Sequence, residues 1–538
     1  MTSAHDPPPP APASRTSWLV WGSLVAVAAA FVTRLPAIVE PLGPDQGVYA
    51  TIGWALERGL ALYRNLFEQK PPAIYLTYRL GFAVFGATPA AIFWLDYLAA
   101  AITTIVLFDL GRRLVHARFG AIAAAVFAWG TLPAARHAYG GFLERSINEP
   151  FIILFVAVAA WATAIWIRRR SGAWPAVAGL AIGLASVYKP MALVYGLAIA
   201  VWVAAAGDFA AARRWVTRAL PASVLPPALA LGWMWWTGIL EPAWIALAEY
   251  NSAYLAVGDV SLVGIIDQFA HEVWRRMKTD EIWAFGTLAA AAAVLAWRRH
   301  RTRAGAAASL GVLWLGATLV AVVLNGPRMF QTYFVPCLVP LCFLAAWMVD
   351  QVIGARGRWK SPAAAALVAL AILMFVRSGS IGRAASMTTW DGRHWVGAMD
   401  RDTYLQRFQS RAPGAFSAAD NERLAEYLRA RTDPDERIFV FGMTASAYFQ
   451  SGRLPASRFL FVYPAVSNMI DRPGFTVDSL AAELARTRPR YIVLQRGNRD
   501  SFSGWRADES FAAPAMTDLL REYVQEADIG GFGVYRRQ

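Results

Sequence analysis

Charged residues are scarce in this chain of 538 residues. Asp, Glu, Lys and Arg make up 16% of the sequence, whereas a soluble protein usually carries about 25%. Hydrophobic residues make up 57%. The formal net charge is +14, but the basic residues lie in short clusters between apolar runs, an arrangement that sets membrane topology. The composition therefore predicts a membrane protein and argues against nucleic acid as a partner.

Cysteine and nucleotide-binding motifs are also lacking. The only two cysteines, Cys337 and Cys342, fall in one apolar run, so we interpret them as inert, membrane-buried thiols. The glycines near Gly442 do not form a G-x-G-x-x-G motif, which argues against a dinucleotide cofactor. No internal repeat of the kind found in many transporters is evident in the sequence.

Apolar runs long enough, or nearly so, to cross about 30 Å of hydrocarbon recur through the first part of the chain. From their number we predict an α-helical polytopic membrane protein with about eleven crossings. The first run is too long for a typical signal peptide and is interpreted as a retained anchor. The predicted crossings lie near residues 18–37, 90–110, 119–135, 149–167, 174–189, 191–206, 218–238, 282–297, 308–324, 333–350 and 361–377.

Arginine-rich connections between these runs set the predicted orientation, because positive loops stay in the cytoplasm. Placing all of them inside gives a cytoplasmic N-terminus and an external C-terminus. The apolar run Ala73–Phe85 then cannot be a crossing, since it would move Arg112 and Arg113 outside, and it is short and contains Arg79. We expect it to form an external juxtamembrane or re-entrant helix. The long external loops are then 38–89, 136–148 and 239–281.

Composition divides the chain into four parts. Residues 1–17 are predicted to be a disordered, proline-rich cytoplasmic tail, and 18–377 a transmembrane domain. Residues 378–418 are predicted to be a linker, and 419–538 an external soluble α/β domain, because strand-like and helix-like runs alternate there. The expected helices are Ala419–Ala430, Thr476–Thr487 and Met516–Glu526, and the expected strands are Arg437–Phe441, Tyr491–Leu494 and Phe532–Tyr535.

The first predicted external loop contains a candidate catalytic pair. Asp45 follows the first membrane run by about eight residues, and Lys70 precedes Pro71-Pro72 in the same loop. A carboxylate can take a proton from a hydroxyl, and an ammonium can neutralise a phosphate leaving group. The structural alternatives are that Asp45 caps a helix Gly47–Arg58 and that Lys70 is a cation anchored at the membrane interface.

Further ionisable residues are predicted to lie on the same external face. Glu144 and Glu149 stand at the mouth of a crossing, where a carboxylate is a candidate functional group or a favourable first-turn acid. Together with Lys70, the cations Lys189 and Arg328 have the chemistry to surround a phosphate or pyrophosphate, although each alone is more often an interface anchor. His271-Glu272 is a weak candidate for metal binding, and no other histidine shows ligand spacing.

Several motifs resemble bacterial GT-C glycosyltransferases, more narrowly the branch that contains protein O-mannosyltransferases and the aminoarabinose transferases of lipid A. The motifs are D-Q-G-V-Y from Asp45, L-Y-R-N-L-F-E-Q-K-P-P-A-I-Y from Leu62, N-E-P from Asn148, Y-K-P from Tyr188 and R-M-F-Q-T-Y-F-V-P from Arg328. Three positions depart from the resemblance. Gln46 stands where many relatives have Glu, and Gln69 separates Glu68 from Lys70. In the late motif this chain has Gln331-Thr332-Tyr333, where some relatives have a His before the tyrosine.

The resemblance implies an enzyme that uses a polyprenyl-phosphate-linked sugar and transfers a hexosyl or pentosyl group on the external face of the inner membrane. It implies Asp45 as the catalytic base, and the reaction is predicted to be inverting. Glu149 or Glu144 is expected either to orient the acceptor or to steady the loop that carries Asp45. Lys70, Arg64, Lys189, Arg328 and Tyr333 are the residues predicted to contact the donor phosphate. No cofactor is required by this scheme, although a divalent metal is compatible with it.

Other interpretations of the sequence stay open. The acceptor can be a protein, a lipid or a polysaccharide of the envelope. A secondary transporter is the alternative from another class, and it would call for inverted repeats and broken helices near the midplane. A third interpretation is a non-catalytic lipid-binding protein whose external domain recruits partners.

The predicted topology places Asn65 outside the cell and Arg169 in the cytoplasm. In a background without the native cysteines, a cysteine introduced at Asn65 is expected to react with a membrane-impermeant maleimide in intact cells. A cysteine at Arg169 is expected to react only after the membrane is permeabilised, because its loop carries the positive charge that stays inside. Labelling of the Arg169 position in intact cells would contradict the topology.

Overall fold

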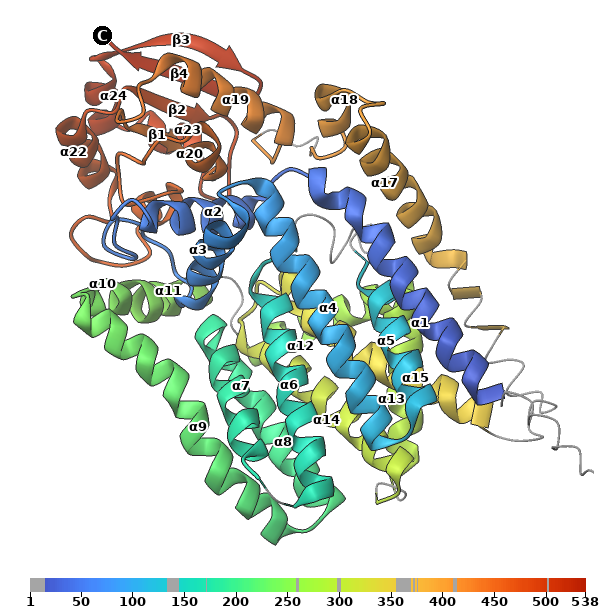
Figure 1. Cartoon of the computed structure of the whole chain (residues 1–538). Helices are drawn as coiled ribbons and strands as arrows, with labels where there is room; N and C mark the ends of the chain where they lie inside the picture. The colour runs from blue at the N-terminus through green and yellow to red at the C-terminus, as the bar shows by residue number, and fades with distance from the viewer. Residues whose placement is uncertain are drawn as a thin grey trace, which may run out of the picture.

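The computed structural model describes residues 15–132, 145–170, 172–257, 261–297, 301–354, 369–370, 373–374, 376–409, 414–500 and 503–538. A bundle of long helices makes up most of the molecule, and a small α/β domain formed by the end of the chain sits at one end of it (Figure 1). The predicted crossing at 361–377 lies largely outside the described residues. Each of the other predicted crossings coincides with a helix.

Five segments of the described chain are long and apolar enough to cross a membrane by length and composition. Their helices are α1 (Arg15–Arg34), α4 (Pro89–Leu114), α6 (Asn148–Arg169), α14 (Arg303–Leu324) and α15 (Leu338–Gly354). Shorter apolar helices pack among them: α5 (Ala117–Gly130), α7 (Trp174–Tyr188), α8 (Leu193–Ala206) and α13 (Glu281–Leu295). The longest helix is α9 (Phe209–Trp236), which has three internal prolines. The number of crossings stays a prediction.

Small residues let two of these helices approach closely. A Cβ atom added at Gly179 or Gly183 of α7 would overlap the backbone carbonyl oxygen of Ala219 or Ser223 of α9. Within a membrane, close backbone contact of this kind replaces the hydrophobic effect as the main source of attraction between helices. The glycines of α7 therefore fix the position of α9 along the bundle.

Two short helices, α2 (Pro44–Leu56) and α3 (Ala73–Phe85), lie at the end of the bundle that carries the α/β domain (Figure 1). The bounds of α3 agree with the prediction, and its 13 residues extend about 20 Å, too little for a crossing. Helix α2 begins three residues earlier than predicted. Asp45 therefore lies in its first turn, and the residue before the helix, Gly43, donates its backbone N–H to the side chain of Gln46 (2.8 Å).

Two regions predicted as connections contain helices. The loop 239–281 forms α10 (Leu240–Trp244), a π-helical turn (Ile245–Tyr250), α11 (Asn251–Leu255) and α12 (Leu262–Thr279). The linker 378–418 contains α17 (Ser380–Trp395) and α18 (Arg401–Leu405), and α17 packs against the 3₁₀ turn Leu35–Val39 that ends α1 (Figure 1). These amphipathic segments were not recognised because their charged faces gave them a loop-like composition.

Buried charges attach this linker region to the membrane domain. The Glu40 carboxylate is 5% exposed and pairs with Arg145 (3.1 Å) and Arg407 (3.2 Å). Arg407 also pairs with Asp391 of α17. Because charges removed from water are stable only when they are paired, these four groups hold the segment after α17 against the end of α1.

The C-terminal domain contains a four-stranded sheet in the order β1-β2-β4-β3. Strands β1 (Ile438–Phe441) and β2 (Tyr491–Gln495) are parallel, with Ile438 opposite Tyr491, and β2 and β3 (Tyr523–Ile529) each pair antiparallel with β4 (Phe532–Arg537). Among the described residues of this domain, the helices that accompany the sheet are α19 (Ala418–Arg431), α20 (Ser446–Ser451), α21 (Tyr463–Val466), α22 (Val477–Thr487), α23 (Ala507–Phe511) and α24 (Pro514–Leu520).

The prediction of a helix over Met516–Glu526 is wrong for the last residues of that range. Helix α24 ends at Leu520, and residues from Tyr523 onward form β3. Strand β3 joins β4 through a tight turn in which Gly530 has φ +53°. Pairing with β4 therefore determines the structure of this segment.

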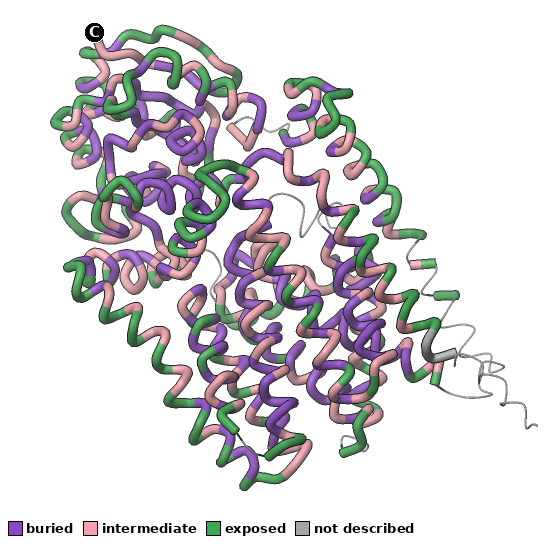
Figure 2. The backbone as a smooth tube through the Cα atoms, in the orientation of Figure 1, coloured by how far each residue is buried: buried purple, intermediate pink, exposed green. Residues whose placement is uncertain are grey.

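The C-terminal domain packs directly on α2 and α3. The Thr51 hydroxyl donates to the backbone carbonyl of Ala445 (2.9 Å), and the Phe82 ring stacks on Phe449 (5.2 Å between centroids). A Cβ atom at Gly47 would lie 2.7 Å from Cβ of Ser446 in α20. Figure 2 shows the continuous buried backbone of α2 beneath the domain. The first loop and the C-terminal domain therefore form one packed unit.

Replacing Gly47 with Ala is expected to lower the melting temperature of the protein, because the added methyl group collides with α20. Overpacking of this kind typically costs about 1–3 kcal/mol. The matched control is Gly232→Ala in α9, where a Cβ atom has no neighbour within 4 Å. Both variants are compared by thermal unfolding in lipid nanodiscs. Equal melting temperatures for Gly47→Ala and the unmodified protein would contradict close docking of the domain.

Candidate active site

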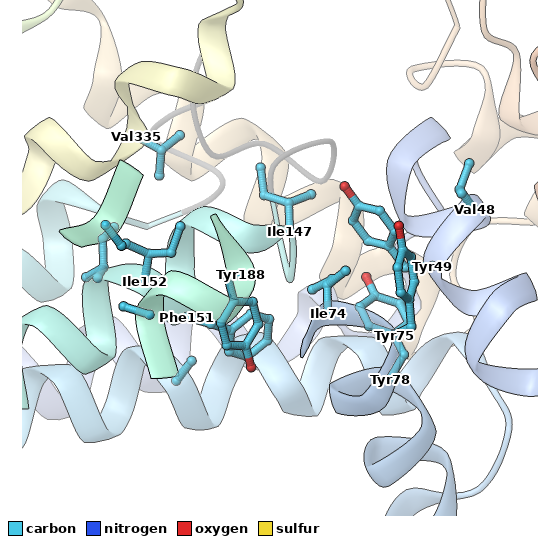
Figure 3. Packing of buried hydrophobic residues seen from close by; sticks show 14 of the residues in the cluster. Val48, Tyr49, Ile74, Tyr75, Tyr78, Ile147, Phe151, Ile152, Tyr188 and Val335 are labelled. Carbon is cyan, nitrogen blue, oxygen red and sulfur yellow. The ribbon is translucent and has the colours of Figure 1, made fainter. Parts of the chain in front are cut away.

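Three tyrosines connect α2 and α3 at the base of the candidate site. The ring of Tyr49 packs edge-on against Tyr75 (5.9 Å between centroids) and Tyr78 (5.6 Å). Figure 3 shows this cluster beside Ile74, with Phe151 and Tyr188 of α6 and α7 nearby. The Tyr78 hydroxyl donates to the carbonyl of Ser146 (2.9 Å). The cluster therefore fixes the two short helices against the start of α6.

Asp45 lies on the first turn of α2, partly exposed, above this cluster. Its Oδ2 accepts a hydrogen bond from the Tyr49 hydroxyl (3.2 Å). Burial raises the pKa of Tyr49 well above its ordinary value, with a further contribution from Asp45, so the hydroxyl stays protonated and donates. The neighbouring Gln46 is fully buried and donates to the carbonyl of Arg145 (2.7 Å). The turn that carries Asp45 is therefore held by its neighbours on both sides.

Lys70 is directed into the site by Glu68. The Glu68 side chain is 1% exposed, and it accepts hydrogen bonds from the Lys70 ammonium (3.3 Å), the Lys70 backbone N–H (3.2 Å) and the Tyr75 hydroxyl. The Lys70 ammonium also lies over the Tyr49 ring, 5.2 Å from its centroid. Burial opposes the charged form, but Asp45 and Glu68 hold the pKa of Lys70 well above its ordinary value. Lys70 is thus a permanently charged group.

Lys189 and Glu149 form a second pair on the bundle side of the site. Lys189 follows the last residue of α7, and Glu149 lies in the first turn of α6 with 3% exposure. The two side chains form an ion pair. The Lys189 ammonium lies 4.5 Å from the centroid of the Tyr333 ring, which places the late sequence motif next to this pair.

Arg328 joins the site from the connection before α15 and meets the C-terminal domain. Its guanidinium lies over the Tyr254 ring (3.8 Å to the centroid) and 3.6 Å from the carboxylate of Asp500. Asp500 also accepts a hydrogen bond from the Tyr463 hydroxyl (3.0 Å). The next residue, Met329, has φ +43°, a left-handed conformation that is costly for a side chain of this size and changes the direction of the backbone after Arg328.

Electrostatic contacts connect these parts into one group. Besides Glu68, the groups that raise the pKa of Lys70 against the effect of burial are Asp45, Tyr254 and Tyr333. Tyr254 in turn lies within the fields of Arg328, Lys70 and Asp45, although burial is the main cause of its raised pKa. Residues from distant segments of the chain thus surround a single region between α2, the connection before α15 and the C-terminal domain.

Two predicted residues are not placed in this group. Arg64 is exposed and donates a hydrogen bond to the carbonyl of Gly238, at the end of α9. Glu144 lies outside the described residues.

A metal site is not formed by the described part of the chain, where no three His, Cys, Asp or Glu side chains gather. Glu272, which belongs to the weak candidate metal site His271-Glu272, forms ion pairs with Arg275 (2.7 Å) and Arg276.

Three residues of the site were missed or undervalued by sequence reasoning. Glu68 was noted only as a neighbour of Lys70, although the spacing Glu-x-Lys is compatible with a side-chain pair. Tyr254 and Asp500 lie in segments whose folded positions no local pattern reveals. The ion pair between Arg328 and Asp500 joins residues on opposite sides of the domain boundary.

Comparison with protein families identifies one match. Residues 69–236 match the family model described as dolichyl-phosphate-mannose-protein mannosyltransferase. The match starts at Gln69 and includes Lys70, Glu149 and Lys189. No curated protein matches the sequence. The family-model match confirms the resemblance inferred from the motifs.

Solved structures show the same fold. ArnT from Cupriavidus metallidurans bound to undecaprenyl phosphate is 16% identical, with 97% of this chain and 98% of that chain covered and a TM-score of 0.59. The apo form of ArnT gives 17% identity, the same coverage and a TM-score of 0.56. The oligosaccharyltransferase of Archaeoglobus fulgidus in complex with Zn and sulfate is 14% identical over 96% of this chain and 73% of that chain, with a TM-score of 0.51. The predicted GT-C fold is confirmed.

Proposed function

We propose that this protein is a membrane glycosyltransferase that moves a sugar from a polyprenyl-phosphate donor to an acceptor hydroxyl, on the external face of the membrane, with inversion at the anomeric carbon. The observation that carries the proposal is that three of the four carboxylates around the site are paired with a cation and the fourth is not. Glu68, Glu149 and Asp500 each hold a cation. Asp45 forms no ion pair with any described residue and accepts only the Tyr49 hydroxyl.

The chemistry of a general base fits Asp45. One of its oxygens is engaged by Tyr49 (3.2 Å), which leaves the other for an acceptor hydroxyl. In the proposed step, Asp45 takes the proton of that hydroxyl while the acceptor oxygen forms a bond to the anomeric carbon. The bond from this carbon to the phosphate oxygen breaks, and its electron pair leaves with the polyprenyl phosphate. Because attack and departure are on opposite faces of the sugar, the configuration inverts.

The cations fit the developing charge on the departing phosphate. Lys70, Lys189 and Arg328 come from three different segments and face the same region. Each cation has an acidic or aromatic partner that fixes its position before a donor binds. Preorganised positive charge stabilises a developing negative charge most effectively, because no rearrangement is needed during the reaction. Tyr333, which lies under Lys189, is assigned to the same phosphate site.

The similarity to ArnT supports this assignment of the donor. One of the two ArnT structures with this fold has undecaprenyl phosphate bound to the protein. A lipid-linked donor stores the energy for transfer in its phosphate linkage, so the scheme calls for no soluble nucleotide. Glu149 positions Lys189 in the proposed site through their ion pair, and Glu68 does the same for Lys70.

Asp45→Asn is expected to lower the rate of transfer by about 10²–10⁴-fold, the usual contribution of a general base, with little change in melting temperature. Asn is nearly isosteric and can still accept the hydrogen bond of Tyr49. The assay follows labelled sugar from purified polyprenyl-phosphate sugars to an envelope extract. Asp402→Asn is the control, because Asp402 also occupies the first turn of a helix. Near-normal transfer by a stable Asp45→Asn protein would assign the base elsewhere.

Lys70→Ala is expected to reduce transfer by about 10²–10³-fold, since it removes one donor aimed at developing charge. Lys70→Arg keeps the positive charge and should retain part of the activity. The control is Lys278→Ala, which alters an exposed lysine of α12. The rates are measured at saturating donor so that weaker donor binding is separated from slower chemistry. Full activity of Lys70→Ala would show that the residue is an interfacial anchor.

A further inference from the structure

A cavity lies beside the helix turn that carries Asp45. It has a volume of about 420 Å³ and is formed where the C-terminal domain meets the start of α2. Pro44, the residue directly before Asp45, contributes to its wall. The remaining wall comes from the end of the linker, Gly414–Phe416, and from the C-terminal domain. The polar residues that the domain contributes are Asn421, Thr444, Ser446, Gln495, Asn498 and Arg499. None of the residues assigned to the donor phosphate lines this cavity.

Hydrogen bonds hold the amide groups of this wall in fixed orientations. The Gln495 side chain is 5% exposed and accepts hydrogen bonds from the backbone N–H of Met443 (2.8 Å) and the Thr444 hydroxyl (3.1 Å). The Gln495 and Asn498 amide nitrogens both donate to the carbonyl of Gly414, at 3.2 and 3.0 Å. Gly414 has φ +68°, and a side chain there would collide with the backbone of Gly497. These hydrogen bonds and this close contact therefore fix the shape of the wall.

Two lining residues carry a buried oxygen without a hydrogen-bond partner in the described part of the chain. They are Oδ1 of Asn498, whose residue is 8% exposed, and Oγ of Ser446, whose residue is 3% exposed. An unpaired buried polar atom costs about 1–3 kcal/mol, and such atoms are few in native proteins. Both atoms are almost inaccessible to solvent, so they belong to the layer directly beneath the cavity surface.

The composition of the wall favours a neutral ligand rich in hydroxyl groups. Amides and hydroxyls both donate and accept, as the alternating groups of a sugar require. Phe416 and Met443 add apolar surface suited to the C–H face of a pyranose ring. Among the described residues that line the cavity, none is acidic, and the single cation, Arg499, is exposed at its edge.

We propose that this cavity binds a saccharide unit of the acceptor, so that the hydroxyl to be glycosylated belongs to a glycan or to the sugar headgroup of a glycolipid. The inference rests on the proposed glycosyl transfer, because it assigns the acceptor to that reaction. The first turn of α2 separates the cavity from the donor site: Pro44 faces one, and Asp45 belongs to the other. A saccharide held here is therefore bound next to the proposed base.

The test uses the full-length protein in phospholipid nanodiscs, free of sugar-headed detergents that would compete for the cavity. Saturation-transfer NMR measures binding of three neutral probes: mannotetraose, maltotetraose and chitotetraose. Ala415→Trp fills the cavity from a half-buried residue of its wall. The matched control is Ala513→Trp, at another half-buried alanine of the domain that does not line the cavity. Binding by the unmodified protein and the control, and its loss in Ala415→Trp, is the expected result.

Transfer kinetics on the same preparations separate this inference from the proposed function. Ala415→Trp should raise KM for the acceptor by at least about tenfold, roughly the effect of losing one or two hydrogen bonds, and leave KM for the donor unchanged. Transfer to a water-soluble glycan indicates a polysaccharide source, and transfer only to extracted lipid indicates a glycolipid source. Saccharide binding without any transfer would refute the proposed function and leave the cavity a saccharide site. Normal acceptor KM in Ala415→Trp, or transfer to peptides alone, would overturn the inference.

Discussion

Pairing of charge at the edge of a nonpolar medium determines the arrangement of the candidate active site. A cation withdrawn from water is stable only beside a carboxylate or an aromatic face, and each of the three cations has both: Lys70 with Glu68 and Tyr49, Lys189 with Glu149 and Tyr333, and Arg328 with Asp500 and Tyr254. These partners come from the first loop, the start of α6, α11, the 3₁₀ turn before α15 and the C-terminal domain. The need to pair each cation therefore holds five separate segments at one place.

Much of the architecture follows from the sequence because it depends on local signals. Apolar runs of membrane length, proline before α3 and arginine between crossings are each visible in a short window. The bounds of α3 and of β2 were predicted almost to the residue for this reason. The motifs around Asp45 and Lys70 identified the resemblance to GT-C glycosyltransferases, which the family-model match over residues 69–236 and the shared fold confirm together.

The remainder depends on contacts between distant parts of the chain. Strand β3 forms because it pairs with β4, and its own residues 523–526 resemble the end of a helix. The ion pair of Arg328 with Asp500 requires the C-terminal domain to sit above the start of α15. Helices α12 and α17 carry many charges on one face, so composition alone classified them as connections. Local patterns contain no information about such partners, and only the packed structure supplies it.

The docking of the C-terminal domain on α2 has a consequence for how the protein is made. Thr51 and the carbonyl it binds, that of Ala445, are 394 residues apart in the chain. At a synthesis rate of about 5–20 residues per second, roughly 20–80 seconds separate the emergence of the two surfaces. During this interval the face of α2 around Gly47 and Trp54 has no partner. A nascent chain therefore holds an incomplete candidate active site until its last domain has folded, and a truncated product would expose an apolar surface that quality-control proteases can recognise.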